Sequence, residues 1–398
     1  MSGRFKIAVV SGTRADYGLL KPVLQRLRDD GELELQLFLT GMHLVADFGR
    51  TELVVAQDGF EMTERVEMLL SSDTAVGITK STGLGIIGFA DVFERHQPDI
   101  LIALGDRFEL FSAVTAALMR RLPVAHIHGG EGTHGVIDEA IRHAVSKMSY
   151  LHFTATEDYR RRVIQMGEAP ERVFNVGALA VEIAASMDFL SRAEIGKLLD
   201  IEIGRPFFVV TFHPATLEIS QAAAQCQAML DALVLHDEAS IVVTYPNADT
   251  DSRSIIPLIE EFCAKAPSKR TVMRSLGQRA YMSCLKEADV VVGKSSSGII
   301  EAPLFATPTV DIGDRQRGRV VPDSVIRVGV NKADIDAAIR KALSSDFRGK
   351  LKSLRHPYGN GDASSIIVKQ VKAHLATGID LKKSFHDLPT GREGQELS

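Results

Sequence analysis

Short apolar runs rich in Val and Ile alternate along the chain with longer segments in which apolar residues recur at helical spacing. In the first half these runs occupy residues 7–10, 35–40, 100–104 and 124–127. Short runs that stay apolar throughout, each followed by a polar or glycine turn, are typical of buried parallel strands that alternate with helices. The first half therefore predicts an α/β domain with a doubly wound parallel sheet.

The same alternation restarts in the second half of the chain. Strand candidates separated by helical stretches occupy residues 207–211, 241–244, 271–273, 290–293 and 309–312. The pattern predicts a second doubly wound domain, so the expected fold class is α/β with two Rossmann-like domains.

The boundary between the domains is expected at 175–180, where a strand-like segment at 172–176 gives way to a helical stretch. This division gives an N-terminal domain of residues 1–178 and a C-terminal domain of residues 179–362. A last helix at 363–376 is expected to complete the first domain. The polar residues 377–398 are expected to be loosely ordered.

Composition narrows the class of protein. The 398 residues suffice for two domains, and 45% hydrophobic with 24% charged residues is ordinary for a globular protein. Three cysteines without a CxxC pair argue against a disulfide framework or a thiolate zinc site, and suit the reducing cytoplasm. A formal net charge of −5 offers no basic field for nucleic acid. No run approaches about 18 uninterrupted apolar residues, so neither a membrane span nor a signal sequence is expected.

Unusual polar residues follow the predicted strands, where α/β domains bind ligands. The first strand leads into a glycine turn and a helix N-terminus that, with Arg14, favour an anion such as a phosphate. The alternative is an ordinary turn in which Asp16 caps the helix. The third strand ends at Asp106 and Arg107, where Asp106 is either a site residue or a helix cap.

The fourth strand runs into His126, His128, Glu131 and His134, a segment broken by paired glycines. Strand alternation would place His126 and His128 on one side. A metal site is the alternative to consider, but the segment is extended and lacks a fourth ligand in register. Acid/base chemistry is therefore favoured, and no metal is expected.

Downstream, residues 137–143 have helical spacing, which puts Asp138 and Arg142 on one face. That face is either part of the same site or a solvated surface with one salt bridge. The GxGxxG match at 83–88 is dismissed as a dinucleotide fingerprint because no strand precedes it.

In the second half, His213 stands at a strand end and is a candidate ligand contact. A later strand leads into a donor-rich turn made of Ser295, Ser296, Ser297 and Gly298. Backbone N–H groups and hydroxyls before a helix suit a diphosphate, and Glu301, expected one turn into that helix, can accept hydrogen bonds from a ribose diol. The order of residues is not that of a P-loop.

Together these segments resemble the UDP-N-acetylglucosamine 2-epimerase family, in particular its hydrolysing branch, which makes N-acetylmannosamine or a related sugar for sialic-acid-like nonulosonates. In chain order the matching motifs are GTRADYGLL at 12–20, TGMHL at 40–44, LGDRFE at 104–109, HIHGGEGTHGVIDEAIRH at 126–143, TFHPAT at 211–216, GKSSSGIIEAP at 293–303 and DIGDRQRGR at 311–319. The resemblance spans about residues 7–375, and the long match at 126–143 is its most specific part.

The resemblance implies a fold similar to the GT-B glycosyltransferases, a UDP-sugar bound between the domains, no dissociable cofactor, and a homodimer or homotetramer. It further implies a set of UDP-binding positions, which in this chain are Arg14, Arg107, Arg142, Ser295, Ser296, Ser297, Gly298, Glu301 and Arg315. Tyr281 is expected to stack on uracil, and Asn247 is a further expected contact.

The implied chemistry is an anti elimination of UDP across C1 and C2, which gives a 2-acetamidoglucal, followed by water addition with inversion at C2. The family's acidic positions correspond to Asp106 and Asp138, and its strand-end histidine to His213 near the phosphates. Some members carry Glu where this chain has His128. The second acid/base role therefore falls either to His128 or to Glu131.

The lead hypothesis is hydrolysis of UDP-N-acetylglucosamine to N-acetylmannosamine and UDP. One alternative is the same reaction on UDP-2,4-diacetamido-2,4,6-trideoxyglucose, for legionaminic acid, and another is a non-hydrolysing epimerase, against which the short 137–143 segment argues. A glycosyltransferase of the same fold would not need the acid/base cluster. An inactive sugar-nucleotide sensor would not need Asp106, Glu131, Asp138 and His213 together.

Overall fold

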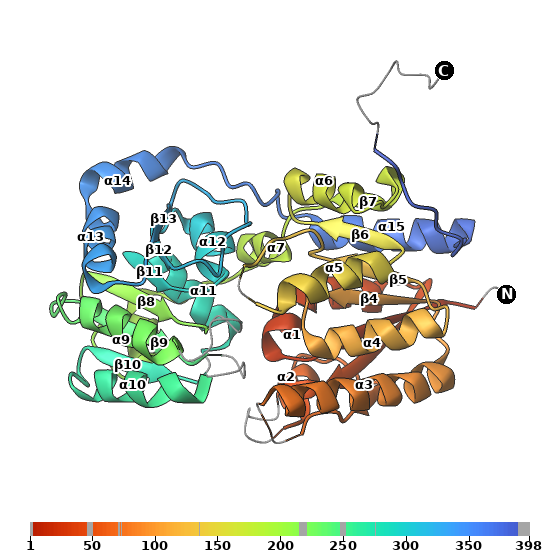
Figure 1. Ribbon diagram of the computed structural model, residues 1–398, viewed down its shortest axis with the longest axis horizontal. Coiled ribbons are helices and arrows are strands. Elements are labelled where there is room, and N and C mark those ends of the chain that lie inside the picture. The colour runs from red at the N-terminus through yellow and green to blue at the C-terminus, as the bar shows by residue number, and fades with distance from the viewer. Residues whose placement is uncertain are drawn as a thin grey trace, which may run out of the picture.

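The computed structural model describes residues 3–45, 51–70, 72, 74–134, 136–214, 221–246, 252–274 and 276–388. They form two α/β domains side by side, each built on a parallel sheet (Figure 1). This confirms the predicted fold class.

The first sheet has the strand order β3-β2-β1-β4-β5-β6-β7, all parallel. Its strands are β1 Phe5–Ser11, β2 Leu33–Thr40, β3 Glu64–Val66, β4 Ile100–Leu104, β5 Val124–Ile127, β6 Leu151–Thr154 and β7 Val173–Asn175. The order reverses at the pair β1 and β4, so ligand chemistry is expected beyond the carboxyl ends of these central strands.

The second sheet has the order β10-β9-β8-β11-β12-β13 and is also parallel. Its strands are β8 Phe207–Thr211, β9 Ser240–Thr244, β10 Arg270–Met273, β11 Val290–Gly293, β12 Thr309–Ile312 and β13 Val325–Val328. Here the switch in strand order lies between β8 and β11, which places His213 and the serine-rich turn at the corresponding edge.

Helices cover both faces of each sheet. The helices are α1 Arg14–Asp29, α2 Glu52–Gln57, α3 Ala75–His96, α4 Phe108–Met119, α5 Asp138–Met148, α6 Glu157–Gln165, α7 Leu179–Ser186, α8 Arg192–Leu199, α9 Ala222–Leu233, α10 Ser252–Ala264, α11 Gly277–Glu287, α12 Ser297–Ile300, α13 Lys332–Leu343, α14 Ser345–Lys350 and α15 Ala363–Thr377. Short 3₁₀ turns are η1 Gly41–Leu44, η3 Pro170–Arg172, η4 Ala302–Phe305 and η5 Leu351–Ser353.

Strand alternation divides the cores. In β1, Ile7 and Val9 belong to the core shared with α1 and α15, whereas Ala8 and Val10 belong to the core under α3 and α4. In β8, Phe208 packs towards α9, α10 and α13, and Phe207 packs towards α8 and α11. A strand buried on both faces reads as a continuous apolar run, and for this reason these strands were predictable.

Three strands were missed. β3 and β13 are short edge strands in which every residue except Val66 is exposed or half-buried, and charged residues interrupt both sequences. β6 is fully buried but contains His152, whose Nε2 lies 3.1 Å from a carboxylate oxygen of Glu168. Glu168, 16 residues away, satisfies the buried ring of His152. The residues around His152 give no indication of this partner.

Helix α15 crosses back to the first domain and packs against α1, with Ile367 and Val371 fully buried (Figure 1). The described part of the tail after it differs from the expected loose order. Lys383 donates to Glu168 at 2.8 Å, and the N–H of His386 donates to the carbonyl of Gly167 at 2.9 Å. The buried carboxylate of Glu168 thus attaches the polar tail to the first domain.

Helix α3 is, of the helices in the described ranges, the one long and apolar enough to pass a length-and-composition test for a membrane span. Its residues Phe89 and Phe93 are buried in the core beneath it, as in the core helix of a folded domain. The GxGxxG match at 83–88 lies inside this helix, where the residues form no phosphate-binding turn. The dismissal of a dinucleotide fingerprint agrees with that placement.

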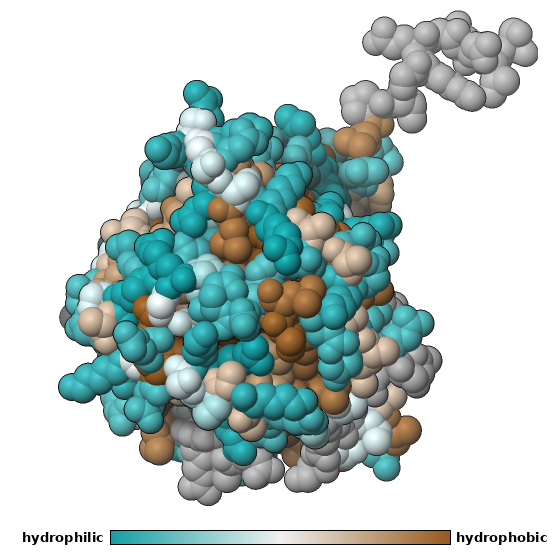
Figure 2. All heavy atoms as spheres, turned by 90° about the vertical axis from the view of Figure 1, so that its left-hand side faces the viewer, coloured by the Kyte–Doolittle hydropathy of each residue, from teal (hydrophilic) through white to brown (hydrophobic). Residues whose placement is uncertain are grey.

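Large apolar side chains remain exposed on α3, namely Val76, Leu84 and Ile87, and at the end of α4, namely Leu118 and Met119. By contrast, the face of the second domain in Figure 2 is mostly hydrophilic, with small separate hydrophobic groups. Exposed apolar side chains that recur along one helix are typical of an interaction surface.

Candidate active site

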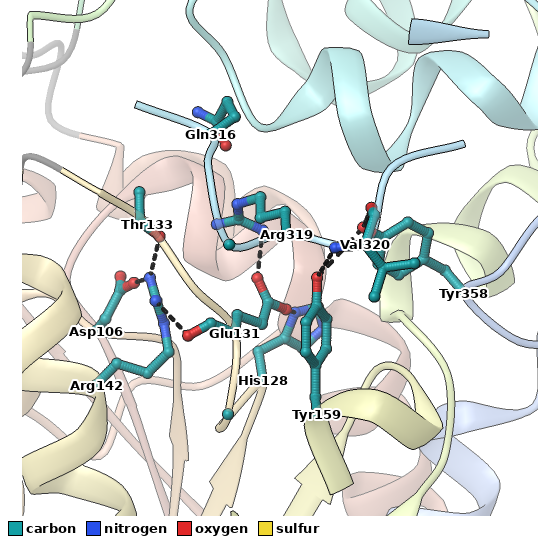
Figure 3. A network of polar contacts seen from close by, with 12 residues as sticks. Asp106, His128, Glu131, Thr133, Arg142, Tyr159, Gln316, Arg319, Val320 and Tyr358 are labelled. Atoms are coloured by element: carbon teal, nitrogen blue, oxygen red, sulfur yellow. Dashed lines mark hydrogen bonds and ion pairs between the residues drawn. The ribbon is translucent and has the colours of Figure 1, made fainter. Parts of the chain in front are cut away.

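The ends of two adjacent strands supply the acid/base residues. β4 and β5 pair in parallel, so the segments that follow them, which carry Asp106, His128 and Glu131, leave the sheet at the same edge. Figure 3 shows these side chains together with Arg142 of α5. Asp106 and Arg142 are 36 residues apart in the sequence, and the parallel pairing of the strands brings their segments together.

Arg142 is the hub of this group. Its side chain is 2% exposed and is ion-paired with Asp106. It also donates to the hydroxyl of Thr133 at 2.9 Å and to the backbone carbonyl of Glu131 at 2.9 Å. The solvated-surface interpretation of the 137–143 segment is therefore wrong, because a buried guanidinium must satisfy its donors inside the protein.

Glu131 has both carboxylate oxygens engaged. One lies 2.8 Å from Nδ1 of His128, and the other is ion-paired with Arg319 of the second domain (Figure 3). Burial pushes the pKa of Glu131 upward, but Arg319 and His128 outweigh burial and hold the pKa well below its ordinary value. Glu131 is therefore a carboxylate at neutral pH.

The backbone of this segment is unusual. His128 adopts a left-handed conformation with φ of 67°, which is strained for a residue with a side chain. Gly130 has φ of 78°, and a Cβ there would lie 2.4 Å from the carbonyl oxygen of Tyr159. The turn aims His128 at Glu131, and the second ring nitrogen of His128 is buried without a partner among the described residues.

His126 has a structural role in the same strand. Its ring nitrogens lie 2.8 Å from the carbonyl of Gly105 and 3.0 Å from the hydroxyl of Ser146. Burial lowers the pKa of His126 to about 3, so the ring is neutral. It braces the turn after β4 and is not paired with His128 in a metal site. No group of three or more potential metal ligands occurs within the described ranges.

The first phosphate candidate, Arg14, begins α1 and reaches the second domain. A Cβ on Gly277 at the start of α11 would lie 2.7 Å from a guanidinium nitrogen of Arg14. The helix cap is Thr13, whose hydroxyl accepts from the N–H of Asp16, so the interpretation of Asp16 as the cap is wrong. Arg14 is therefore placed between the domains at a helix N-terminus, a favourable position for an anion.

Arg107 precedes α4 and occupies its N-cap position, so Asp106 is not the cap. Its guanidinium is ion-paired with the buried Glu109 at 3.2 Å. This pairing holds the guanidinium of Arg107, the residue next to Asp106, in place.

The second domain presents a compact hydroxyl cluster after β11. Ser295 and Ser297 have their hydroxyls 3.0 Å apart, and the Tyr281 hydroxyl bonds to Ser297. Burial raises the pKa of Tyr281 to about 12, so it stays neutral. Ser296 occupies the N-cap of α12 without a side-chain cap bond.

Glu301 lies one turn after Ser297 and directly follows α12, which ends at Ile300 and is succeeded by a 3₁₀ turn. Gly298 packs closely on β12, since a Cβ there would lie 2.6 Å from the side chain of Thr309. One Glu301 oxygen is buried without a partner among the described residues, and burial raises the pKa of Glu301 to about 7. Such a carboxyl is ready to meet a ligand hydroxyl.

The remaining sequence-predicted residues are placed as follows. Asp138 begins α5 and is half-buried, His213 follows β8 and is half-buried, and Arg315 after β12 donates to the carbonyl of Lys294 at 3.2 Å. Asn247 lies outside the described residues.

A family model described as UDP-N-acetylglucosamine 2-epimerase matches residues 25–372. The chain belongs to the UDP-N-acetylglucosamine 2-epimerase family. The resemblance drawn from the motifs is thereby confirmed.

Similar proteins cover nearly the whole chain. It is 37% identical over 383 residues to the GDP/UDP-N,N'-diacetylbacillosamine 2-epimerase (hydrolyzing) of Campylobacter jejuni, covering 96% of this chain and 99% of that protein. It is 36% identical to polysialic acid biosynthesis protein P7 of Escherichia coli, covering 96% and 98%. The Methanocaldococcus jannaschii UDP-GlcNAc 2-epimerase, solved with UDP-GlcNAc and UDP, matches with a TM-score of 0.78 at 17% identity, covering 93% and 100%. That likeness supports the GT-B-like fold.

Three side chains at the candidate site were not predicted from the sequence. Arg319, Tyr159 and Tyr358 were not singled out, although Arg319 stands in the quoted 311–319 motif. Arg319 pairs with a residue 188 positions earlier, and the tyrosines are 199 positions apart. Contacts between domains have no local periodicity, so only the motif itself could have drawn attention to Arg319.

Proposed function

We propose that the protein is a hydrolysing 2-epimerase of UDP-linked 2-acetamido sugars, which releases UDP and the free sugar inverted at C2. The observation that carries the proposal is the buried constellation of Asp106, Arg142, Glu131 and His128 beyond β4 and β5, joined by Arg319 to the donor-rich second domain. Simple nucleotide binding does not require two neighbouring carboxylates that are each ion-paired with a separate arginine.

The first step is an elimination. A base takes the proton from C2 while the C1–O bond breaks and its electron pair leaves with UDP. We assign Asp106 as this base, because its side chain is 23% exposed and can reach substrate while its ion pair with Arg142 holds it in place. The Glu131 side chain is 4% exposed and lies deeper.

The leaving group is a diphosphate, and its charge must be met by cations and hydrogen-bond donors. Arg14 and Arg107 from the first domain and Ser295 and Arg315 from the second are assigned to this task. They come from the strand ends of both sheets, so binding the diphosphate draws the two domains onto one ligand. Glu301 is assigned to the ribose hydroxyls.

The second step hydrates the 2-acetamidoglucal. Glu131 takes a proton from water as the water oxygen bonds to C1, and His128 gives a proton to C2 from the face opposite to Asp106. The hydrogen bond from Nδ1 of His128 to Glu131 keeps the two groups together. Asp106 and Glu131 then release the protons that they took, and His128 regains one from solvent, so that each turnover consumes one water and frees one proton with UDP. In this scheme the two candidates left open by the sequence act as one pair.

Two substrates fit the proposal. UDP-N-acetylglucosamine is the lead from the sequence, and UDP-2,4-diacetamido-2,4,6-trideoxyglucose is the second candidate. The name of the Campylobacter jejuni relative, a diacetylbacillosamine 2-epimerase at 37% identity, favours the diacetamido sugar. We propose the diacetamido sugar as the better substrate and UDP-N-acetylglucosamine as the alternative.

The test is to incubate the purified protein with each UDP-sugar and to separate nucleotides and free sugars by chromatography. Free UDP with an equal amount of free sugar is expected. Formation of a UDP-linked epimer without free UDP would assign the non-hydrolysing reaction, and UDP binding without turnover of either sugar would overturn the enzyme assignment. The matched control is Asp106→Asn, which should bind UDP and turn over neither sugar.

We further propose a homo-oligomer that works in the cytoplasm. The exposed apolar side chains of α3, among them Leu84 and Ile87, support self-association, and the three buried free cysteines support a reducing compartment. Light scattering of the wild type and of Ile87→Glu tests the first point, with a smaller particle expected for the variant.

A further inference from the structure

A loop of the second domain, residues 313–320 after β12, lies directly against the acid/base segment of the first domain. We call it the bridging loop. Besides the ion pair between Arg319 and Glu131, the two backbones touch, since a Cβ on Gly132 would lie 2.8 Å from the carbonyl oxygen of Gly318. This close approach requires glycine at position 132.

Two tyrosines also hold the backbone next to Arg319, namely Tyr159 of α6 in the first domain and Tyr358 of the segment that leads back to α15 (Figure 3). The N–H of Val320 donates to the Tyr159 hydroxyl at 2.9 Å, and the Tyr358 hydroxyl donates to the Val320 carbonyl at 2.6 Å. Both tyrosines are fully buried. The bridging loop is therefore fixed in place by specific contacts to both the N–H and the carbonyl of Val320.

The bridging loop brings the positive charge of Arg319 to the negative charge of Glu131. The Arg319 and Glu131 side chains are 8% and 4% exposed, so their attraction is little screened by water. If the domains separate, Glu131 loses its ion pair with Arg319. The titratable groups that remain near Glu131 or act on it from the surrounding elements are His128, Arg142, Tyr159, Glu301 and Tyr358.

We propose that Arg319 is a positioning residue that completes the hydration machinery across the domain interface, orienting the Glu131 carboxylate towards His128 only when the bridging loop is docked. This inference rests on the proposed function and names a residue outside the sites assigned above. It couples docking of the two domains to the readiness of the water-activating pair. The unreacted glycal is then hydrated only in the closed enzyme.

The experiment compares wild type, Arg319→Ala and Arg319→Lys on whichever UDP-sugar the wild type turns over, with UDP affinity measured by calorimetry. The matched control is Arg317→Ala, in the same loop, whose side chain is 60% exposed and paired with Asp314. Arg319→Ala should lower kcat about 100-fold and change UDP affinity less than about threefold. Added guanidinium should restore about a tenth of the lost rate, Arg319→Lys should lie in between, and Arg317→Ala should match wild type.

Three results would overturn the inference. The first is a kcat for Arg319→Ala within threefold of wild type. The second is a parallel loss of kcat and UDP affinity, which would make Arg319 a UDP ligand. The third is a loss of rate that neither guanidinium nor lysine relieves, which would indicate support of the fold alone.

A second measurement separates this inference from the proposed function. A double-mutant cycle of Arg319→Ala and Glu131→Gln on thermal unfolding measures the coupling of the pair without any substrate. Coupling that is larger than for the pair Arg317→Ala and Glu131→Gln is expected. If the wild type turns over neither UDP-sugar, the proposed function fails, and the absence of coupling in this cycle would overturn the positioning role independently.

Discussion

Arg142 of α5 is ion-paired with Asp106 beyond β4 and, through its other nitrogen, donates to the carbonyl of Glu131 beyond β5. One buried side chain therefore sets the spacing between the two candidate acid/base carboxylates. Parallel pairing of β4 and β5 brings the segments together, and Arg142 fixes their relative position.

Removal of that side chain should be costly for both stability and activity. Arg142→Ala leaves Asp106 without its cation and strands a backbone carbonyl, so unfolding free energy should fall by about 3 kcal/mol. The Asp106 carboxylate should also lose orientation, and kcat should fall by at least 100-fold. Urea denaturation and steady-state rates check both.

The control for that variant is Arg161→Ala, whose side chain is 72% exposed on α6. It should change stability by less than about 0.5 kcal/mol, as for most surface substitutions. If Arg142→Ala lost no more unfolding free energy than Arg161→Ala, Arg142 would not be the residue that holds the two carboxylate segments together.

The turn after β5 should not tolerate a methyl group. Gly130→Ala combines a positive φ of 78° with a Cβ 2.4 Å from the carbonyl oxygen of Tyr159, so the turn must shift. We expect a loss of about 2–3 kcal/mol in unfolding free energy. Gly31→Ala, where nothing lies within 4 Å of the added Cβ, is the comparison. Equal stability of the two variants would show that the turn is not constrained as described.

Glu301 should make both stability and ligand binding depend on pH. Its folded pKa of about 7 exceeds the ordinary 4.5 because of burial, so the folded state holds a proton that the unfolded state has released between these pH values. Its contribution to stability is therefore full below about pH 4.5 and is lost as pH rises through 7. Thermal unfolding of both proteins from pH 5 to 8 checks this prediction. The melting temperature of the wild type minus that of Glu301→Gln should decrease as the pH rises.

The same carboxyl should accept ribose hydroxyls better when ionised, so UDP affinity should rise from pH 6 to 8 in the wild type. Glu301→Gln should flatten that rise. An identical pH profile in both proteins would remove Glu301 from the ribose site.

Lys383 should stabilise the first domain through Glu168. Lys147, His152 and Lys383 together outweigh burial and lower the pKa of Glu168 to about 2, so this stabilisation is present above pH 4.5 and lost as pH falls towards 2. Lys383→Ala should lower the melting temperature at pH 7 more than at pH 3. Lys382→Ala, at an exposed neighbouring position, should change neither. Unaltered melting of Lys383→Ala would mean that the tail attachment contributes nothing.

The sequence predicted the fold well because the central strands are buried on both faces. Runs such as 7–10 and 290–293 had to be apolar throughout, and this signal is local. β6 escaped detection because His152 is buried against Glu168, a residue in another turn. The spacing of hydrophobic residues cannot reveal that a buried polar side chain has a partner elsewhere in the sequence.

The candidate site was predictable where residues follow strands directly. Asp106, His128 and Glu131 stood out by type and position, and the placement of Arg142 in a helix was predicted from its spacing. Arg319 could not be assigned from its own surroundings, because its partner Glu131 lies 188 residues earlier, in the other domain.

The most direct test of the central claim is proton NMR of the wild-type protein with its UDP-sugar in D2O. The account predicts free UDP together with a free sugar inverted at C2 and carrying deuterium there, because C2 is deprotonated and later reprotonated from solvent-exchanged groups. Release of a sugar that retains the original C2 proton and configuration would contradict the account, since UDP would then have been displaced by simple hydrolysis at C1.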